Sequence, residues 1–167
     1  VDERDAIRLG REIVAHLDWK KAARPTPRLV RPPRHPADEL RAIVPQDLKV
    51  PFDMREVIAR LVDGSDFLEF KASLATDTIC GHARLLGQRI GILGNNGPIQ
   101  PAGSTKAAQF IQLCDQTGTP LVFLQNTTGY MVGKVAEQAG AIKHGSKMIQ
   151  AVANARVPKF TVVLGGS

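Results

Sequence analysis

The chain has 167 residues, 43% of them hydrophobic and 23% charged, which suffices for one domain with a sizeable core. Its net charge is +6, but the arginine-rich stretch 24–41 has no interleaved aromatic residue on which bases could stack. Because no apolar run approaches the roughly 20 residues of a membrane span either, we expect neither nucleic acid nor a membrane as partner.

The first elements expected are a helix and a proline-rich linker. An apolar stripe predicts a helix over residues 2–17, with acidic residues near the end that the helix dipole favours. Five prolines between residues 25 and 36 then remove backbone donors, which favours a linker or surface strap. We divide the chain into a helix from the end of a preceding domain (1–20), a proline-rich linker (21–51) and an incomplete globular domain (52–167).

The globular part begins with a short helix and contains several strands. Asp53, with Glu56 three residues later, predicts a capping box at the start of the helix. Five segments have strand patterns: residues 67–71, 78–85, 89–93, 121–125 and 160–164. The pattern of 78–85 alternates like a half-buried strand, whereas the apolar run 121–125 is expected to be buried on both faces and 160–164 to be a further buried strand.

Two longer helices alternate with the last strands. Ser104 is expected to be the N-cap of a helix over about 104–117. A second helix is expected over about 135–154, with one inward apolar face: Val135, Ala139, Ile142, Ile149 and Val152. Strand–helix–strand crossovers imply parallel pairing, so the order of elements predicts an α/β layered domain.

Two cysteines and three glycine-containing loops are the remaining chemical features. Cys80 and Cys114 lack companions for a zinc site, so we expect buried, reduced thiols and no metal. The loops 94–97, 127–134 and 165–167 follow predicted strands, at the sheet edge where α/β folds place ligands. Backbone amides there can donate to a developing oxyanion, although glycines after strands also serve simply as turns.

Three stretches carry a resemblance to a known family. VPQDLKVPFDMREVIARLVDGSDFLEFKA (44–72), FLQNTTGYMVG (123–133) and HGSKMIQAVANARVPK (144–159) resemble the carboxyltransferase (beta) subunits of biotin-dependent acyl-CoA carboxylases. The likeness runs through residues 40–167 and is greater to the methylcrotonoyl-CoA and geranyl-CoA carboxylase branch than to the propionyl-CoA branch. PIQPAG (98–103) departs from the methylcrotonoyl pattern, which favours a longer or different branched substrate.

The resemblance implies a crotonase-like ββα superhelix, of which residues 52–167 would be part of the C-terminal carboxyltransferase domain. Such subunits move a carboxyl group from carboxybiotin, held on a separate carrier, to the enolate of an acyl-CoA such as 3-methylcrotonoyl-CoA or geranyl-CoA. Backbone oxyanion holes hold both anions, and no metal is needed. Implied partners are a biotin carboxylase or biotin carrier subunit and further copies of the chain. Implied locations are the cytoplasm or, in a eukaryote, the mitochondrial matrix.

The resemblance also assigns site residues. The acyl-CoA would be bound by the first loop: Gly94, Asn95, Asn96 and Gly97. Carboxybiotin would be bound by the other two loops: Thr128, Gly129, Tyr130, Met131, Gly133, Lys134, Gly165 and Gly166. The backbone amides of Gly129 and Gly133 would be catalytic. By the same resemblance, one amide pair would come just after Gly165-Gly166-Ser167 and the acyl-CoA hole would lie in the N-terminal domain of a partner subunit, so we expect this chain alone to be inactive.

Three alternatives stay open. A crotonase-type enoyl-CoA hydratase or isomerase would need paired carboxylates, for which Glu69 and Glu137 are the available candidates. A biotin-dependent acyl-CoA decarboxylase would run the same transfer backward. The chain could also be a fragment that serves only in assembly, without catalysis.

Overall fold

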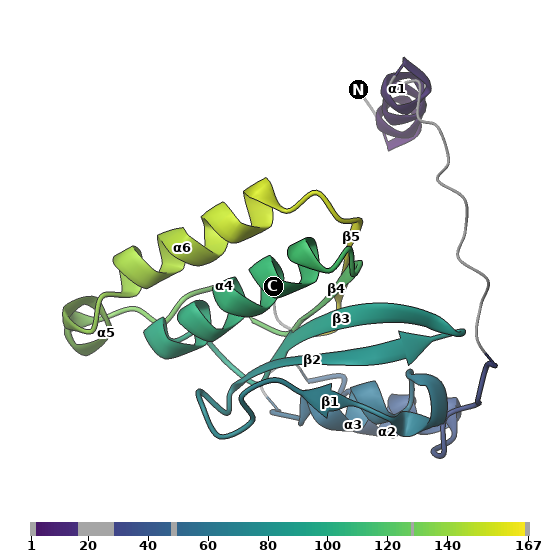
Figure 1. Ribbon diagram of the computed structural model, residues 1–167, viewed down its shortest axis with the longest axis horizontal. Helices are drawn as coiled ribbons and strands as arrows, with labels where there is room; N and C mark the ends of the chain where they lie inside the picture. Colours follow the sequence, from purple (N-terminus) through teal and green to yellow (C-terminus); the bar gives the residue numbers. More distant parts are fainter. Residues whose placement is uncertain (1–2, 17–28, 48–49, 128, 166–167) are drawn as a thin grey trace.

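The computed structural model describes residues 3–16, 29–47, 50–127 and 129–165, which form a layered α/β structure on a five-stranded sheet (Figure 1). The strands are β1 Leu68–Glu69, β2 Thr78–Leu85, β3 Gln88–Asn95, β4 Leu121–Gln125 and β5 Lys159–Val163, and they follow one another across the sheet in chain order. β1, β2 and β3 pair antiparallel. The pairs β3–β4 and β4–β5 are parallel, which confirms the expected crossovers.

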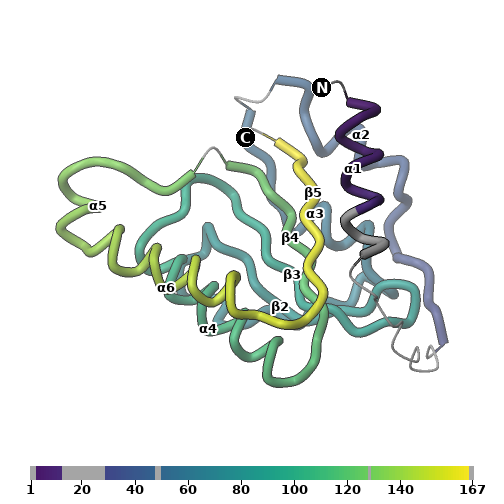
Figure 2. The backbone as a smooth tube through the Cα atoms, turned by 90° about the horizontal axis from the view of Figure 1, so that it is seen from above, coloured from purple at the N-terminus to yellow at the C-terminus, as the bar shows by residue number. Residues whose placement is uncertain are grey.

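The described helices are α1 Glu3–His16, α2 Leu40–Ile43, α3 Met54–Ala59, α4 Pro101–Gln116, α5 Lys134–Gln138 and α6 Ala141–Asn154, with 3₁₀ turns at Ala37–Glu39 and Asp63–Ser65. Helices cover both faces of the sheet. α4 and α6 lie side by side over one face, and α3 lies against the other (Figure 1, Figure 2). Residues 37–43 are thus helical within the stretch expected to be linker, because the run of prolines ends at Pro36, which is the N-cap of the first turn.

Side chains of the central strands alternate between two apolar layers. Ile79 and Ile92 pack with α3, whereas Cys80 and Leu93 pack with α4. β2 is therefore covered on both faces over most of its length, and the expectation of a half-buried strand at 78–85 is wrong. Both cysteines are buried free thiols, as expected. Burial raises the pKa of Cys80 to about 12 and that of Cys114 to about 11.

Two helices begin differently from the sequence expectation. Asp53 caps α3 by accepting the N–H of Arg55 at 3.0 Å, but Glu56 completes no capping box because its carboxylate forms an ion pair further along the chain. α4 begins at Pro101, with Gln100 as N-cap, so the expectation of Ser104 as N-cap is wrong. Proline is favoured in the first turn because the N–H that it lacks has no intrahelical partner there.

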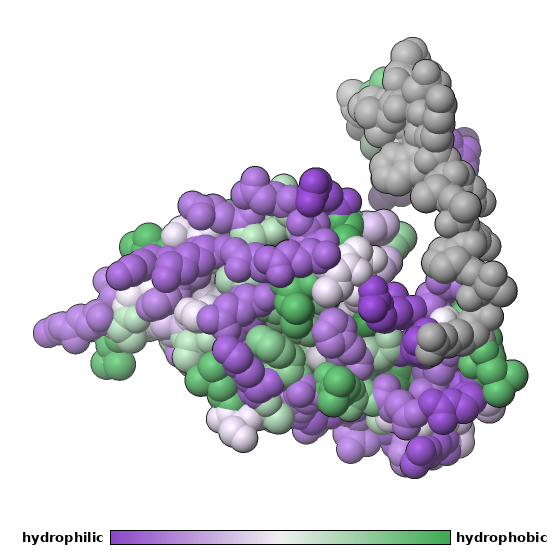
Figure 3. Space-filling view, in the orientation of Figure 1, coloured by the Kyte–Doolittle hydropathy of each residue, from purple (hydrophilic) through white to green (hydrophobic). Residues whose placement is uncertain are grey.

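The expected single helix over 135–154 is two helices. Gly140 has a φ of 84° and separates α5 from α6. Three of the side chains expected inward are exposed: Val135 is 81%, Ile142 82% and Ile149 58% accessible. Val152, by contrast, is half-buried and packs against the core, as expected. Figure 3 shows hydrophobic atoms on the surface at the α5 end of the molecule. The periodicity thus located an apolar face that the described residues leave uncovered.

The last strand is exposed rather than buried. β5 is the edge strand of the sheet, and each of its residues is exposed, including Phe160 at 64%. Its apolar run predicted strand structure correctly but burial wrongly. An edge strand has a neighbour on one side only, so its burial depends on what packs against it from outside.

A buried lysine holds the loop between β1 and β2. Lys106 of α4 is fully buried, and its Nζ donates to the carbonyl oxygen of Leu74 at 2.9 Å. The carboxylate of Glu69 lies 3.9 Å from the same nitrogen. Burial lowers the pKa of Lys106, and the nearby carboxylate opposes that effect. The amphipathic pattern of α4 does not predict that Lys106 is buried, because its partners are backbone carbonyls of a loop.

Asp63 fixes the turn of the β2–β3 hairpin. Leu86 and Gly87 form a two-residue turn with φ of 50° and 76°, the left-handed pair that suits a tight hairpin. The buried carboxylate of Asp63 accepts the N–H of Leu86 at 2.9 Å and that of Gly87 at 2.7 Å.

We expect Asp63→Ala to lower the free energy of unfolding by about 2–4 kcal/mol, because two backbone donors lose a charged acceptor. Urea denaturation measures this. The matched control is Asp66→Ala, whose half-exposed carboxylate pairs with Arg31, and it should cost at most about 1 kcal/mol. Equal losses in the two variants would contradict this account of the hairpin.

Candidate active site

The amide side chain of Asn95 bridges the carboxyl ends of β3 and β4. Its Nδ2 donates to the carbonyl oxygen of Asn126 at 2.9 Å and to that of Gly97 at 2.7 Å. Its Oδ1 accepts the N–H of Asn126 at 3.0 Å. Asn95 is buried, so these bonds replace water at backbone groups that the parallel ladder leaves unpaired where it ends. The bridge fixes the first two glycine-containing loops against each other.

The same two loops also pair through their backbones. Ile99 and Tyr130 form a parallel bridge, in which Ile99 donates to Gly129 at 3.1 Å and Met131 donates to Ile99 at 2.9 Å. The ring of Tyr130 rests against Gly145 of α6, and burial raises the pKa of its hydroxyl. The loop after β4 is therefore held by the first loop and by a helix.

The third loop meets the second at Gly165. A Cβ at Gly165 would lie 1.8 Å from Oδ1 of Asn126, a distance that no real side chain tolerates. Leu164, just before it, donates its N–H to Gln125 at 2.9 Å. All three loops that the sequence predicted to share one sheet edge thus come together, as far as the described residues extend.

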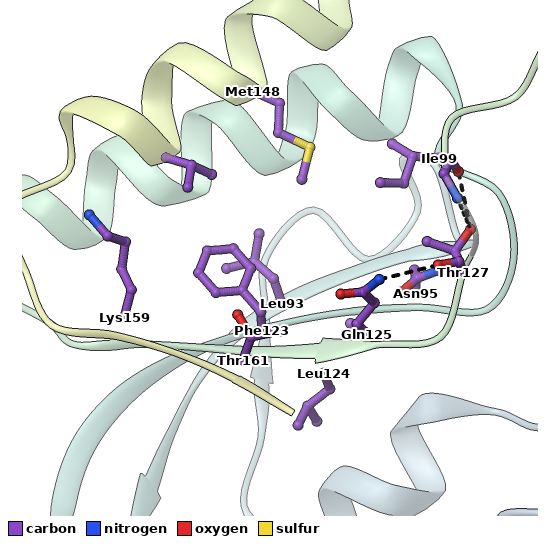
Figure 4. A pocket seen from close by; sticks show the side chains of 13 residues that line it. Leu93, Asn95, Ile99, Phe123, Leu124, Gln125, Thr127, Met148, Lys159 and Thr161 are labelled. Atoms are coloured by element: carbon purple, nitrogen blue, oxygen red, sulfur yellow. Dashed lines mark hydrogen bonds between the residues drawn. The ribbon is translucent and has the colours of Figure 1, made fainter. Parts of the chain in front are cut away.

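A cavity of about 420 Å³ opens beside these loops, between the sheet and α6 (Figure 4). Most of its wall is apolar: Leu93, Ile99, Phe123, Leu124, Met148 and Val152. Polar groups come from Asn95, Gln125 and Thr127 at one end and from Lys159 at the other. Apolar walls with a few converging polar groups are typical of sites for small organic ligands.

The predicted site residues divide between two places. Gly94, Asn95 and Gly129 line the cavity beside α6. Met131, Gly133 and Lys134 instead line a second hollow of about 450 Å³ between the loop and the start of α4. Thr128 and Gly166 lie outside the described residues.

Asn96 and Gly97 do not line the cavity beside α6. Asn96 turns to the start of α3, where its Oδ1 accepts the N–H of Met54 at 2.8 Å and its Nδ2 donates to Asp53 at 2.9 Å. Gly97 supplies a carbonyl oxygen to Asn95. In this chain, Asn96 supports the loop through contacts away from that cavity, and Gly97 supports it through Asn95.

The two glycines predicted as amide donors differ in their surroundings. The N–H of Gly129 donates to the hydroxyl of Thr127 at 3.2 Å, a long bond that a ligand oxygen can replace. Gly133 has a φ of 112° and precedes α5. Both positions have open space where a Cβ would stand, so their glycines serve backbone conformation rather than close packing.

Three residues of the site were not among the residues to which the sequence assigned binding. Asn126 directly follows β4 and Thr127 begins the predicted loop 127–134, and the polar pair directly after a buried strand was the available signal. Lys159 begins β5, and its Nζ donates to the carbonyl oxygen of Ala155. It is the only titratable side chain among the described residues that line the cavity.

The two carboxylates considered for acid–base chemistry lie outside the cavity beside α6. Glu69 forms two hydrogen bonds with Arg55, at 2.7 and 2.9 Å, and Glu137 is exposed on α5. Neither belongs to the cavity wall, so the described cavity offers no pair of carboxylates for acid–base chemistry.

The described residues likewise contain no cluster of His, Cys, Asp or Glu suited to a metal ion. None of the described helices has the length and apolar character to cross a bilayer.

Comparison with protein families gives a match to the carboxyl transferase domain over residues 1–167. The chain belongs to this family. It is 54% identical, over 100% of its length, to a probable biotin-dependent acyl-coenzyme A carboxylase beta2 subunit of Mycobacterium tuberculosis, of which it covers 32%. It is 52% identical, over 99% of its length, to the mitochondrial methylcrotonoyl-CoA carboxylase beta chain of Dictyostelium discoideum, of which it covers 28%.

Among solved structures, the beta subunit of geranyl-CoA carboxylase from P. aeruginosa superposes with a TM-score of 0.81 at 58% identity. That match covers 98% of this chain and 31% of the other. The chain thus spans no more than about a third of each of these proteins. The family match and the structural match confirm the resemblance to carboxyltransferase subunits, and with it the expected crotonase-like fold.

We expect Asn95→Asp to lower the free energy of unfolding by about 2–3 kcal/mol, because two donated hydrogen bonds are lost and a carboxylate faces two carbonyl oxygens. The matched control is Asn154→Asp, where an exposed amide donates once, to Gln150, and the expected loss is at most about 1 kcal/mol. Urea denaturation of both variants measures the difference. A loss at Asn95 no larger than at Asn154 would show that the bridge contributes little.

Proposed function

We propose that this chain is part of a carboxyltransferase that moves a carboxyl group from carboxybiotin, held on a separate carrier, to a branched enoyl-CoA such as 3-methylcrotonoyl-CoA or geranyl-CoA. The observation that carries the proposal is the meeting of three loops at one sheet edge, beside an apolar cavity whose described wall contains no carboxylate. The family match and the names of the relatives support the reaction and the substrates.

The chemistry assigned to the loops is anion stabilisation by backbone N–H groups. Carboxyl transfer places negative charge on the ureido oxygen of biotin and on the thioester oxygen of the acyl-CoA. Fixed amide dipoles stabilise such charge without reorganising, and they do so more strongly where water is excluded. In this proposal residues 128–131, 133 and 134, with Gly165 and Gly166, serve carboxybiotin, and residues 94–97 serve the acyl-CoA. Carboxybiotin supplies the activated carboxyl group, and the apolar wall around Phe123 shields it from water.

Lys134 is proposed to hold a carboxylate during transfer. It is exposed at the first position of α5, in the hollow that also contains Gly133 and Met131. An ammonium group on a flexible stem suits a carboxylate that arrives and leaves. Lys159, at the far end of the cavity beside α6, donates to a backbone carbonyl and is assigned no such role.

The proposed partners are a biotin carboxylase or biotin carrier subunit and further copies of the carboxyltransferase. The exposed apolar side chains at the α5 end, among them Val132 and Ile142, suit a surface that another chain covers. The proposed location is the cytoplasm, or the mitochondrial matrix in a eukaryote, in line with the mitochondrial relative.

A hydratase or isomerase finds less support. Water addition to an enoyl thioester needs carboxylates beside the substrate, and Glu69 is committed to Arg55 in the described structure. A biotin-dependent decarboxylase would use the same loops in the reverse direction. A role in assembly alone would leave the apolar cavity without a use.

The test is carboxylation by the protein that contains this chain, supplied with a biotin carboxylase and its biotinylated carrier. We expect ATP-dependent incorporation of labelled bicarbonate into 3-methylcrotonoyl-CoA or geranyl-CoA. The 167-residue chain alone should transfer nothing from free carboxybiotin. Hydration of enoyl-CoA without biotin, or turnover by the isolated chain, would contradict the proposal.

Gly165→Ala tests the loop geometry within the same assay. The added methyl group must displace Asn126, and a shift of about 1 Å at a catalytic loop lowers rates roughly 100-fold. Gly10→Ala is the matched control, because a Cβ there meets nothing within 4 Å. Equal activity of the two variants would show that the third loop does not belong to the site.

A further inference from the structure

A further cavity, with basic side chains in its wall, lies at the opposite end of β3 from the candidate active site. It measures about 590 Å³ and is formed by the β2–β3 hairpin, β1 and the turn at Asp63–Ser65. Arg89 on its wall stands six residues before Asn95, which along a strand is roughly 20 Å. The two sites are therefore separate.

Two arginines oppose each other across this hairpin. Arg84 of β2 and Arg89 of β3 are partners in the register and both line the cavity. Like charges in directly opposed positions of a sheet destabilise it unless a counter-charge is present. Among the described residues, each guanidinium donates to one acceptor, a backbone carbonyl: Gly87 for Arg84 at 3.0 Å and Thr117 for Arg89 at 2.7 Å. Four further N–H groups remain on each guanidinium for a ligand.

The carboxylates of the cavity are already committed. Asp63 accepts the two backbone N–H groups of the hairpin turn. Asp66 pairs with Arg31 and lies 3.4 Å from Arg34. Within the described ranges neither Arg84 nor Arg89 forms an ion pair, and the cavity wall carries three arginines against two aspartates.

A histidine on the same strand provides a third polar group. His82 stands two residues before Arg84, so the two side chains project from the same face of β2. Its Nδ1 is buried and has no hydrogen-bond partner among the described residues. Its ring rests on Phe110, with ring centroids 5.0 Å apart. Burial and, secondarily, the charge of Arg89 lower the pKa of His82.

We propose that this hairpin cavity binds a phosphate group through Arg84 and Arg89, with His82 as a further hydrogen-bonding partner. Two guanidinium groups and an imidazole match an anion with several acceptor oxygens, and arginine forks bind phosphate in two-point fashion. The bound anion supplies the ion-pair partner that neither of the opposed arginines has within the described ranges. The phosphate can be free inorganic phosphate or the phosphate of a nucleotide.

Calorimetric titration of the protein tests the site, with inorganic phosphate and adenosine 3′,5′-bisphosphate as separate probes. We expect saturable binding that weakens about tenfold or more in Arg84→Gln and in Arg89→Gln, because each loses a charged hydrogen-bonding partner. The matched control is Arg41→Gln, an exposed arginine of α2, which should bind unchanged. Tighter binding of the bisphosphate indicates a nucleotide ligand, and equal or tighter binding of phosphate indicates the free ion.

Thermal unfolding provides a second readout that separates binding from folding. Each glutamine variant removes one of two opposed charges, so without phosphate it should be at least as stable as the original protein. Phosphate should raise the melting temperature of the original protein more than sodium chloride at equal ionic strength, and it should shift the ring resonances of His82. Equal effects of the two salts, no binding of either probe, or unweakened binding in both variants would overturn the proposal.

Discussion

The hydrogen bonds of Asn95 are the constraint on which the arrangement of the site depends. A parallel sheet ends with backbone groups that have no partner in the next strand, and in this protein one buried amide satisfies them at the ends of both β3 and β4. The same amide holds Gly97, so the first loop cannot move independently of the second. The Ile99–Tyr130 bridge and the contact of Gly165 with Asn126 then add to a frame that Asn95 has set.

This frame rests on a sheet that is packed on both faces. Phe110 and Leu121 on the α4 side, and Met54 and Ile79 on the α3 side, fix the central strands. The loops at their ends are consequently positioned by rigid elements, as a site built from backbone amides requires. Backbone donors cannot change rotamer, so their geometry is only as good as the strands that carry them. The apolar cavity and the absence of carboxylates from its described wall suit that kind of chemistry.

The sequence predicted the strands and the shared edge of the loops, because apolar runs followed by glycines report local backbone structure. It placed the ends of helices less well. Gly140 divides one expected helix into two, and the periodicity of residues 135–154 could not reveal that division. Burial was also misjudged where it depends on distant partners, as at Phe160 on the edge strand and at Ile142 on α6. The roles of Lys106 and Asn95 could not be predicted, because their partners are backbone carbonyls that only the folded chain brings close.

The central claim is that backbone N–H groups at this sheet edge, rather than acidic or basic side chains, hold the anions of the reaction. The most direct measurement is a crystal structure of the whole protein with biotin bound. The account predicts the ureido oxygen at about 3 Å from backbone N–H groups of the loops that follow β4 and β5. Biotin held instead by side-chain carboxylates, or bound away from these loops, would contradict it.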